Sequence, residues 1–178
     1  VKIRNGRILS AEFINDGKTY RATYYKDPSG DSDYYAPDGK SMRKAFLRTP
    51  VEFSRISSGF SLGRKHPILN KIRAHKGVDY AAATGTPVKS TANGKIVHRG
   101  KKGGYGNTII VQHGSKYSTL YAHLSKYRGG LKKGSRIKQG QVIGYIGSSG
   151  LATGPHLHYE LRINGVHRDP LRVKLPGP

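Results

Sequence analysis

Short strand-like stretches separated by glycine turns are the feature of this chain that most limits its fold. The chain contains 24 glycines, and helical periodicity is scarce. From about residue 53 onward, the runs with strand-like sequence are 87–90, 94–100, 107–114, 117–125, 141–147 and 156–163. Many short strands with regular glycine punctuation predict an all-β fold of mainly antiparallel sheet, without a repeat of fixed period.

The first part of the chain has its own strand pattern. Residues 7–36 indicate a β-meander, with strands at 8–15, 18–26 and 31–36 and a hairpin turn at Asp16-Gly17. Residues 40–51 then resemble a linker or strap. We therefore expect a small β-rich accessory domain with its linker at 1–50 and a second domain at 51–178. The accessory domain would be part of a longer N-terminal region.

Composition excludes several classes of protein. The chain has no cysteine, so disulfides and thiolate metal sites are ruled out. No run of 18 apolar residues is present, which argues against a transmembrane helix. The chain starts at Val1 without an apolar leader, so we expect a mature fragment whose membrane anchor, if any, lies outside it.

The net charge of +22 is concentrated in the second domain. Residues 51–178 hold 22 basic and four acidic residues, and positions 80–159 contain no acid at all. Such a surface suits polyanions, which makes a polyanion-binding module one reading. No helix-turn-helix, zinc-finger or aromatic RNA-binding motif accompanies the charge, so we expect no nucleic-acid partner.

Histidines and one isolated aspartate form the strongest chemical signal. In "GPHLHYEL", His156 and His158 are two residues apart on an expected strand, so both side chains lie on the same face. In "HKGVD", His75 and Asp79 flank a glycine that lets the chain turn. Catalytic zinc takes three protein ligands and keeps one position open. His75, Asp79 and one of the two strand histidines would supply that set, with the other histidine beside the metal.

The order of these motifs resembles the LytM/lysostaphin-type zinc metallopeptidases, which cut peptide bonds in bacterial peptidoglycan. The resemblance covers about Phe53 to Leu171 and is carried by "SSGF", "HKGVDYAAATGTPV", "GGYGNTIIVQHG", "YAHLS", "GQVIGYIGSSG" and "TGPHLHYEL". The meander and "DGKSMRKAFLRTPVEFSRISSGF" are further similar to Gram-negative cell-wall endopeptidases of the MepM/ShyA kind. The fold that this implies is an antiparallel β-sheet core with an open groove and the metal at its floor.

The resemblance also implies roles for individual residues. It makes His75, Asp79 and His158 the ligands of one zinc ion per chain, and His123 and His156 the catalytic pair that does not bind metal. Tyr105 and Asn107 are candidates for lining the substrate groove. Some lysostaphin-type members have a tyrosine shortly before the first metal histidine, but residues 64–74 contain none.

Several roles stay open at this level. Either histidine of the catalytic pair can be the general base, with His123 slightly favoured. Glu160 shares the strand parity of the HLH histidines, so it either supports one of them or makes a peripheral salt bridge. The remaining histidines are expected at the surface or in turns: His66, His98, His113 and His167.

The expected activity is zinc-dependent hydrolysis of peptidoglycan cross-links, at D-Ala–meso-diaminopimelate bonds, in cell-wall growth or remodelling. Peptidoglycan is then the partner, and the periplasm or cell envelope is the location. Trimming of a terminal D-Ala would be a side activity. The alternative is a catalytically inactive LytM-like activator of cell-wall amidases. Such relatives typically lose metal ligands, whereas every expected ligand and catalytic histidine is present here.

Overall fold

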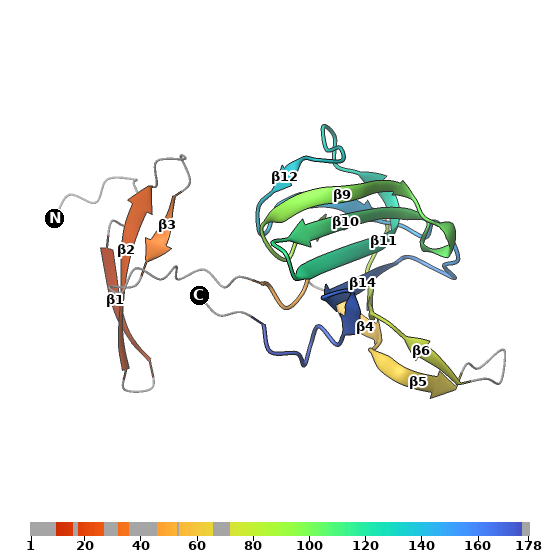
Figure 1. The fold of residues 1–178 in the computed structure, drawn as a ribbon, viewed down its shortest axis with the longest axis horizontal. Coiled ribbons are helices and arrows are strands. Elements are labelled where there is room, and N and C mark those ends of the chain that lie inside the picture. The colour runs from red at the N-terminus through yellow and green to blue at the C-terminus, as the bar shows by residue number, and fades with distance from the viewer. Residues whose placement is uncertain are drawn as a thin grey trace. The chain divides into compact units, whose positions relative to one another are not determined.

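A computed structural model describes residues 10–15, 18–26, 32–35, 46–52, 54–65 and 72–175 (Figure 1). The chain divides into two compact units, one of residues 1–45 with 176–178 and the other of residues 46–175. Our boundary between residues 50 and 51 stays a prediction. His66, one of the histidines that we assigned to the surface, lies outside the described residues.

The first unit contains the predicted meander. Its strands are β1 (Ser10–Asn15), β2 (Lys18–Lys26) and β3 (Ser32–Tyr35), which pair antiparallel in the order β1-β2-β3. Asn15 pairs with Lys18, as a two-residue connection between the strands requires. The predicted Asp16-Gly17 turn itself lies outside the described residues.

The second unit is built from antiparallel strands. They are β4 (Arg55–Ser58), β5 (Ser61–Lys65), β6 (Ile72–His75), β7 (Val78–Ala81), β8 (Pro87–Lys89), β9 (Gly94–Lys101), β10 (Asn107–His113), β11 (Tyr117–Tyr127), β12 (Arg136–Ile137), β13 (Val142–Ile146), β14 (His156–Ile163) and β15 (Val166–Arg168). Within the described residues, the one helical element is a 3₁₀ turn, η1 (Gly103–Tyr105). The all-β prediction is confirmed, while the open groove stays a prediction.

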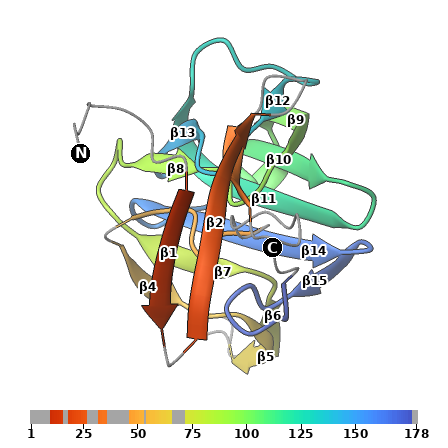
Figure 2. The same ribbon diagram turned by 90° about the vertical axis from the view of Figure 1, so that its left-hand side faces the viewer.

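One large sheet organises this unit. Its strand order is β12-β9-β10-β11-β14-β7-β4, and Figure 1 shows β9, β10, β11 and β14 side by side in that order. Strand β13 pairs with both β11 and β8, and β15 pairs with β14, as Figure 2 shows from another side. Strands β5 and β6 form a separate hairpin.

The predicted strands from residue 87 onward correspond to β8, β9, β10, β11, β13 and β14. The predicted Asn164-Gly165 turn is confirmed as well. These two residues have φ angles of 52° and 78°, and they join β14 to β15. Two successive positive φ angles are what a type I′ hairpin turn requires, and Asn-Gly adopts them readily.

Alternation along β14 separates the core from the chemistry. Leu157, Tyr159 and Leu161 are almost fully buried in the hydrophobic core. Their neighbours His156 and His158 lie on the opposite face of the strand. Leu161 belongs to a small cluster with Phe46 and Ala92. Leu157 and Tyr159 belong to the main core cluster, whose other members are Val51, Val78, Tyr80, Val88, Ile96, Ile109, Val111, Tyr121, Leu124, Ile137, Ile143 and Ile146. The histidine strand is therefore anchored by every second residue.

The segment that enters this unit packs onto it. Phe46 and Val51 are buried, and the backbone N–H of Leu47 donates to the carbonyl of Thr91 at 2.7 Å. Residues 46–51 thus belong to the packed body of the second unit. Across the described residues, no helix has the length and apolar character needed to cross a membrane.

Candidate metal centre

Strand pairing brings Asp79 and His158 together. Strand β7 pairs with β14 so that Asp79 lies opposite His158, and Ala81 lies opposite His156. Directly opposed residues of antiparallel strands point to the same face. Asp79 Oδ1 is 2.8 Å from His158 Nδ1 and 3.9 Å from His156 Nε2. A separation of 79 residues along the chain thus becomes a single side-chain contact.

His75, at the end of β6, completes the group. Its Nδ1 donates a hydrogen bond to the carbonyl oxygen of Gly59 at 2.7 Å. That bond leaves Nε2 as the atom with a free lone pair, and Nε2 lies 3.3 Å from Asp79 Oδ2. The backbone carbonyl therefore sets the tautomer in which Nε2 can bind a metal.

The spacing of these donors fits zinc. One ligand atom from each of His75, Asp79 and His158 lies within 4.8 Å of the others. In a tetrahedral site with bonds of about 2.0–2.1 Å, ligand atoms are roughly 3.3 Å apart. The contacts of 2.8 Å to Asp79 Oδ1 and 3.3 Å to Asp79 Oδ2 place both imidazoles at this carboxylate, and the limit of 4.8 Å leaves room for one ion between the three side chains. Two imidazoles and one carboxylate are also a donor set that zinc accepts.

His158 and His75 keep the carboxylate of Asp79 ionised. Although partial burial raises the pKa of Asp79, hydrogen bonds from His158 and His75 and their charges hold it well below its usual range. Burial likewise lowers the pKa of His158, but Asp79 and Glu160 raise it to about 9. A cation is therefore favoured at this position, whether a proton on His158 or a metal ion that replaces it.

Gly77 is required by a close approach between strands. We expected this glycine to let the chain turn, yet its φ is not in the left-handed region. A Cβ at position 77 would lie 2.4 Å from the carbonyl oxygen of Tyr159 and 2.8 Å from Cε1 of His158. Only a residue without a side chain lets β7 begin this close to β14.

Gly77→Ala is therefore expected to destabilise the protein by roughly 1–3 kcal/mol and to displace His158, because the clashing carbonyl belongs to the backbone. Zinc affinity should fall together with the unfolding free energy. Gly129→Ala is a matched control, since a Cβ there meets nothing within 4 Å. Thermal unfolding and zinc titration of both variants check this. Equal behaviour of the two variants would contradict the close-approach explanation.

His123 reaches the same centre through an unusual backbone conformation. Ala122 pairs with His158, so strict alternation would turn His123 to the opposite face of β11. Its φ of 60° lies in the left-handed region, which non-glycine residues rarely adopt. At this point β11 stops pairing with β14 and begins pairing with β13 at Leu124. As a result, the His123 ring lies 4.7 Å from the ring of His156, measured between centroids.

His123 and His156 are held in the same tautomer. Nδ1 of His123 donates to the carbonyl of Ser149 at 2.7 Å, and Nδ1 of His156 donates to the carbonyl of Gly154 at 2.9 Å. Each ring therefore keeps a lone pair on Nε2. Burial lowers the pKa of His123 below its ordinary value, with further lowering by His156 and His158, so this imidazole is neutral at pH 7.

Glu160 lies behind the metal centre and is completely buried. Its Oε2 accepts from His158 Nε2 at 3.1 Å, while Oε1 accepts from Arg162 at 3.1 Å and lies 2.6 Å from His167 Nε2. Burial raises the pKa of this carboxyl, but the hydrogen bonds from His158 and Tyr105 lower it to about 2. The sequence left two roles open for Glu160, support of a strand histidine or a peripheral salt bridge. The contact with His158 is present, and the salt bridge with Arg162 is formed by a buried carboxylate and is not peripheral.

Tyr105 and Asn107 lie close to these histidines. The Tyr105 ring centroid is 5.7 Å from that of His158, and burial together with a hydrogen bond to Glu160 raises its pKa to about 12. The side-chain amide of Asn107 donates to the carbonyl of Leu124 at 2.9 Å, next to the bulged His123. Contact of either residue with a substrate stays a prediction.

The remaining described histidines differ in how far they are buried. His113 is buried, and its ring nitrogens contact the carbonyl of Asn93 and the hydroxyl of Thr119, both at 2.7 Å, so the surface assignment was wrong. His167 is partly buried against Glu160. His98 is a partly buried residue whose Nε2 contacts the carbonyl of Gly100. The burial of His113 and His167 depends on partners distant in the chain, Asn93 and Glu160, so local sequence does not indicate it.

Comparison with known proteins gives a consistent family. Residues 73–170 match the model of peptidase family M23. The chain is 44% identical to the peptidoglycan DD-endopeptidase ShyC of Vibrio cholerae over 98% of this chain and 39% of that protein. It is also 44% identical to the DD-carboxypeptidase/endopeptidase Mpg of Neisseria meningitidis, over 99% of this chain and 41% of that protein. The chain thus spans about two fifths of the length of these curated relatives.

Solved structures agree in fold. A zinc-containing peptidase from Vibrio cholerae matches with a TM-score of 0.71 and 35% identity, over 96% of this chain and 51% of that one. The catalytic domain of lysostaphin from Staphylococcus simulans matches with a TM-score of 0.59 and 35% identity, over 66% of this chain and 90% of that one.

Proposed function

The chain belongs to peptidase family M23, and on that premise we propose that its second unit is a zinc-dependent endopeptidase of bacterial peptidoglycan. One observation carries the proposal: His75, Asp79 and His158 lie together with two further histidines that have free Nε2 atoms. A metal-binding protein without catalysis would not need the second pair. An inactive activator of amidases would need neither group.

In this proposal, His75, Asp79 and His158 hold one zinc ion per chain. Zinc bound there would polarise the scissile carbonyl and lower the pKa of a bound water to about 7. Asp79 supplies the single negative charge of the ligand set. Glu160 accepts the Nε2 proton of His158, which leaves Nδ1 directed toward Asp79 and the metal position.

His123 and His156 would move protons. His123 is neutral at pH 7 because burial lowers its pKa, so its Nε2 can accept a proton from the attacking water. His156 lies beside it and, in its doubly protonated form, can give its Nε2 proton to the leaving amine or stabilise the developing negative charge. Their Nδ1 bonds to the carbonyls of Ser149 and Gly154 hold both rings in the orientation that these steps need.

The proposed substrate is the peptide cross-link between D-alanine and meso-diaminopimelate, with peptidoglycan as the partner. The activities for which the relatives are named, DD-endopeptidase and DD-carboxypeptidase/endopeptidase, support this bond. Action on that polymer would place the protein in the periplasm or cell envelope. The basic second unit, with 22 basic and four acidic residues in 51–178, suits a polymer that carries carboxylates.

Purified dimeric muropeptides and pentaglycine test the bond. We expect conversion of dimers to monomers, with pentaglycine left intact, and the products can be identified by mass. Release of a terminal D-Ala from pentapeptide monomers would reveal the carboxypeptidase side activity. Efficient cleavage of glycine bonds alongside intact dimers would overturn the substrate assignment.

A further inference from the structure

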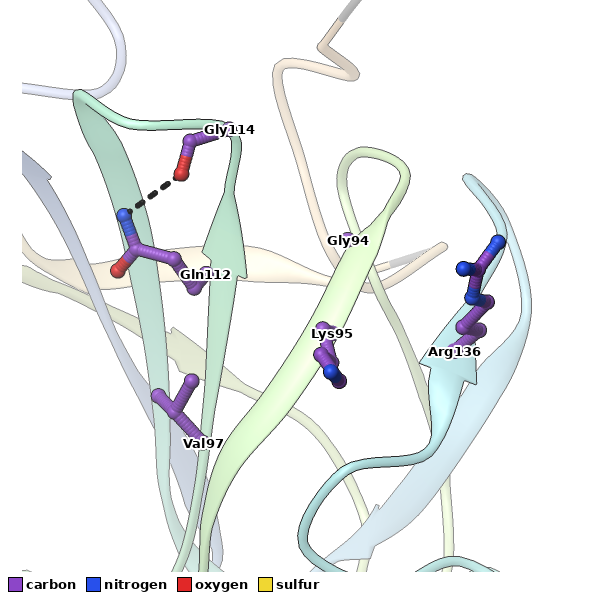
Figure 3. A pocket seen from close by; sticks show the side chains of 6 residues that line it. All are labelled: Gly94, Lys95, Val97, Gln112, Gly114 and Arg136. Atoms are coloured by element: carbon purple, nitrogen blue, oxygen red, sulfur yellow. Dashed lines mark hydrogen bonds between the residues drawn. The ribbon is translucent and has the colours of Figure 1, made fainter.

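A row of cationic and amide side chains crosses β12, β9 and β10, on the side of the large sheet where β12 is the last strand. Arg136 on β12 pairs with Lys95 on β9, and Lys95 pairs with Gln112 on β10. Directly opposed residues share a face, so the three side chains lie next to one another. They line a pocket of about 400 Å³, together with Gly94, Val97 and Gly114 (Figure 3).

Arg136 and Lys95 are like charges in directly opposed positions, an arrangement that destabilises a sheet unless an anion lies between them. The carboxylates of residues 51–178 cannot supply that anion, because all four have other partners among the described residues. Glu52 contacts Lys89, Asp79 contacts His75 and His158, Glu160 contacts His158 and Arg162, and Asp169 contacts Arg172. The second unit therefore presents two adjacent cations without a carboxylate of its own to neutralise them.

The pocket also has an apolar part and a fixed polar part. Val97 is 39% exposed and is one of few large hydrophobic residues exposed in the described chain. The Gln112 amide donates to the carbonyl of Gly114 at 3.0 Å, which holds that side chain at the pocket wall (Figure 3). Two cations beside an apolar surface suit an acidic group on a larger organic framework.

We propose that the pocket of Lys95, Arg136 and Gln112 binds a carboxylate of the peptidoglycan polymer, at a site separate from the metal centre. The inference rests on the proposed function. The row of paired residues continues through Ser118 on β11 to Arg162 on β14. Arg162 is four residues beyond His158 on the same face of that strand. From strand spacings, the pocket is roughly 20–25 Å from the metal centre, which a glycan-linked polymer spans. A sugar-free cross-linked peptide does not, because its four-residue stem reaches only about 14 Å from the scissile bond.

The double variant Lys95→Gln/Arg136→Gln tests this site. Binding to insoluble peptidoglycan sacculi at low salt should weaken about three- to ten-fold, as expected from two lost exposed charge contacts. Turnover of sugar-free cross-linked peptides should be unchanged, because these reach only the metal centre. That turnover also reports folding and the proposed function separately from the pocket. Should the double variant fold poorly, the two single variants carry the same comparison.

Lys132→Gln/Lys133→Gln is the matched control, because both lysines are exposed, lie on the connection before β12 and do not line the pocket. It removes the same charge and should change sacculus binding less than about twofold. Sacculi whose carboxylates have been amidated should no longer distinguish the pocket variant from the wild-type protein. Equal losses of sacculus binding in both double variants would overturn the proposal. So would a binding defect of the pocket variant that persists on amidated sacculi, or one that is seen with DNA but not with sacculi.

Discussion

Asp79→Ala is expected to abolish zinc binding and peptidase activity together. Asp79 contributes the only carboxylate of the cluster and contacts both His75 and His158. Loss of a residue that merely supports a ligand costs about 10–100-fold in affinity, so loss of a ligand should cost at least about 10²-fold. Metal analysis by mass spectrometry and cleavage of dimeric muropeptides measure the two effects on one preparation.

Glu52→Ala is the matched control for that variant. Glu52 is a carboxylate of the same unit, is largely exposed and contacts only Lys89 among the described residues. Its loss should leave zinc content and turnover unchanged. Full zinc occupancy in Asp79→Ala would contradict the ligand assignment, whatever happened to its activity.

His123→Ala and His156→Ala should separate metal binding from catalysis. Neither residue belongs to the His75–Asp79–His158 group, so both variants should keep their zinc. Each should nevertheless lose at least about 10²-fold in kcat, the usual effect of removing a general acid or base. His98→Ala is the control, since its ring nitrogen contacts the nearby carbonyl of Gly100 and it belongs neither to the metal group nor to the catalytic pair. Turnover close to that of the wild type in either variant would remove that histidine from the mechanism.

Much of this centre follows from local sequence pattern. The two-residue spacing in "HLH" places His156 and His158 on one face, and the apolar residues between them determine which face is buried. Asp79 is the only acidic residue between positions 53 and 159, which distinguishes it in the sequence alone. Both inferences depend only on strand alternation and composition, which are properties of the chain itself.

The position of His123 does not follow from alternation. Pairing of Ala122 with His158 would point His123 away from the centre, and only its φ of 60° brings it back. That conformation arises where β11 changes its partner from β14 to β13, at a residue that carries no glycine signal. The order of the motifs indicates that His123 belongs to the catalytic pair. It does not indicate which backbone conformation brings the side chain to the metal centre.

Burial of side chains by segments distant in the chain could not be predicted from the sequence either. Glu160 and His113 carry polar side chains in strands, where half of the positions are ordinarily exposed. Tyr105 and His167 approach Glu160 from other elements, and Asn93 and Thr119 approach His113. The same holds for Gly77, whose neighbours Tyr159 and His158 are about 80 positions away in the chain. Such contacts depend on sheet order, which local patterns do not specify.

Zinc titration of the metal-depleted protein, followed by cleavage of dimeric muropeptides, tests the central claim most directly. The donor set of His75, Asp79 and His158 predicts no cleavage without metal. Activity should then rise with added zinc and level off at about one equivalent per chain. Cleavage by the fully depleted protein, or zinc bound at one equivalent without any cleavage of dimers, would contradict a zinc peptidase at this site.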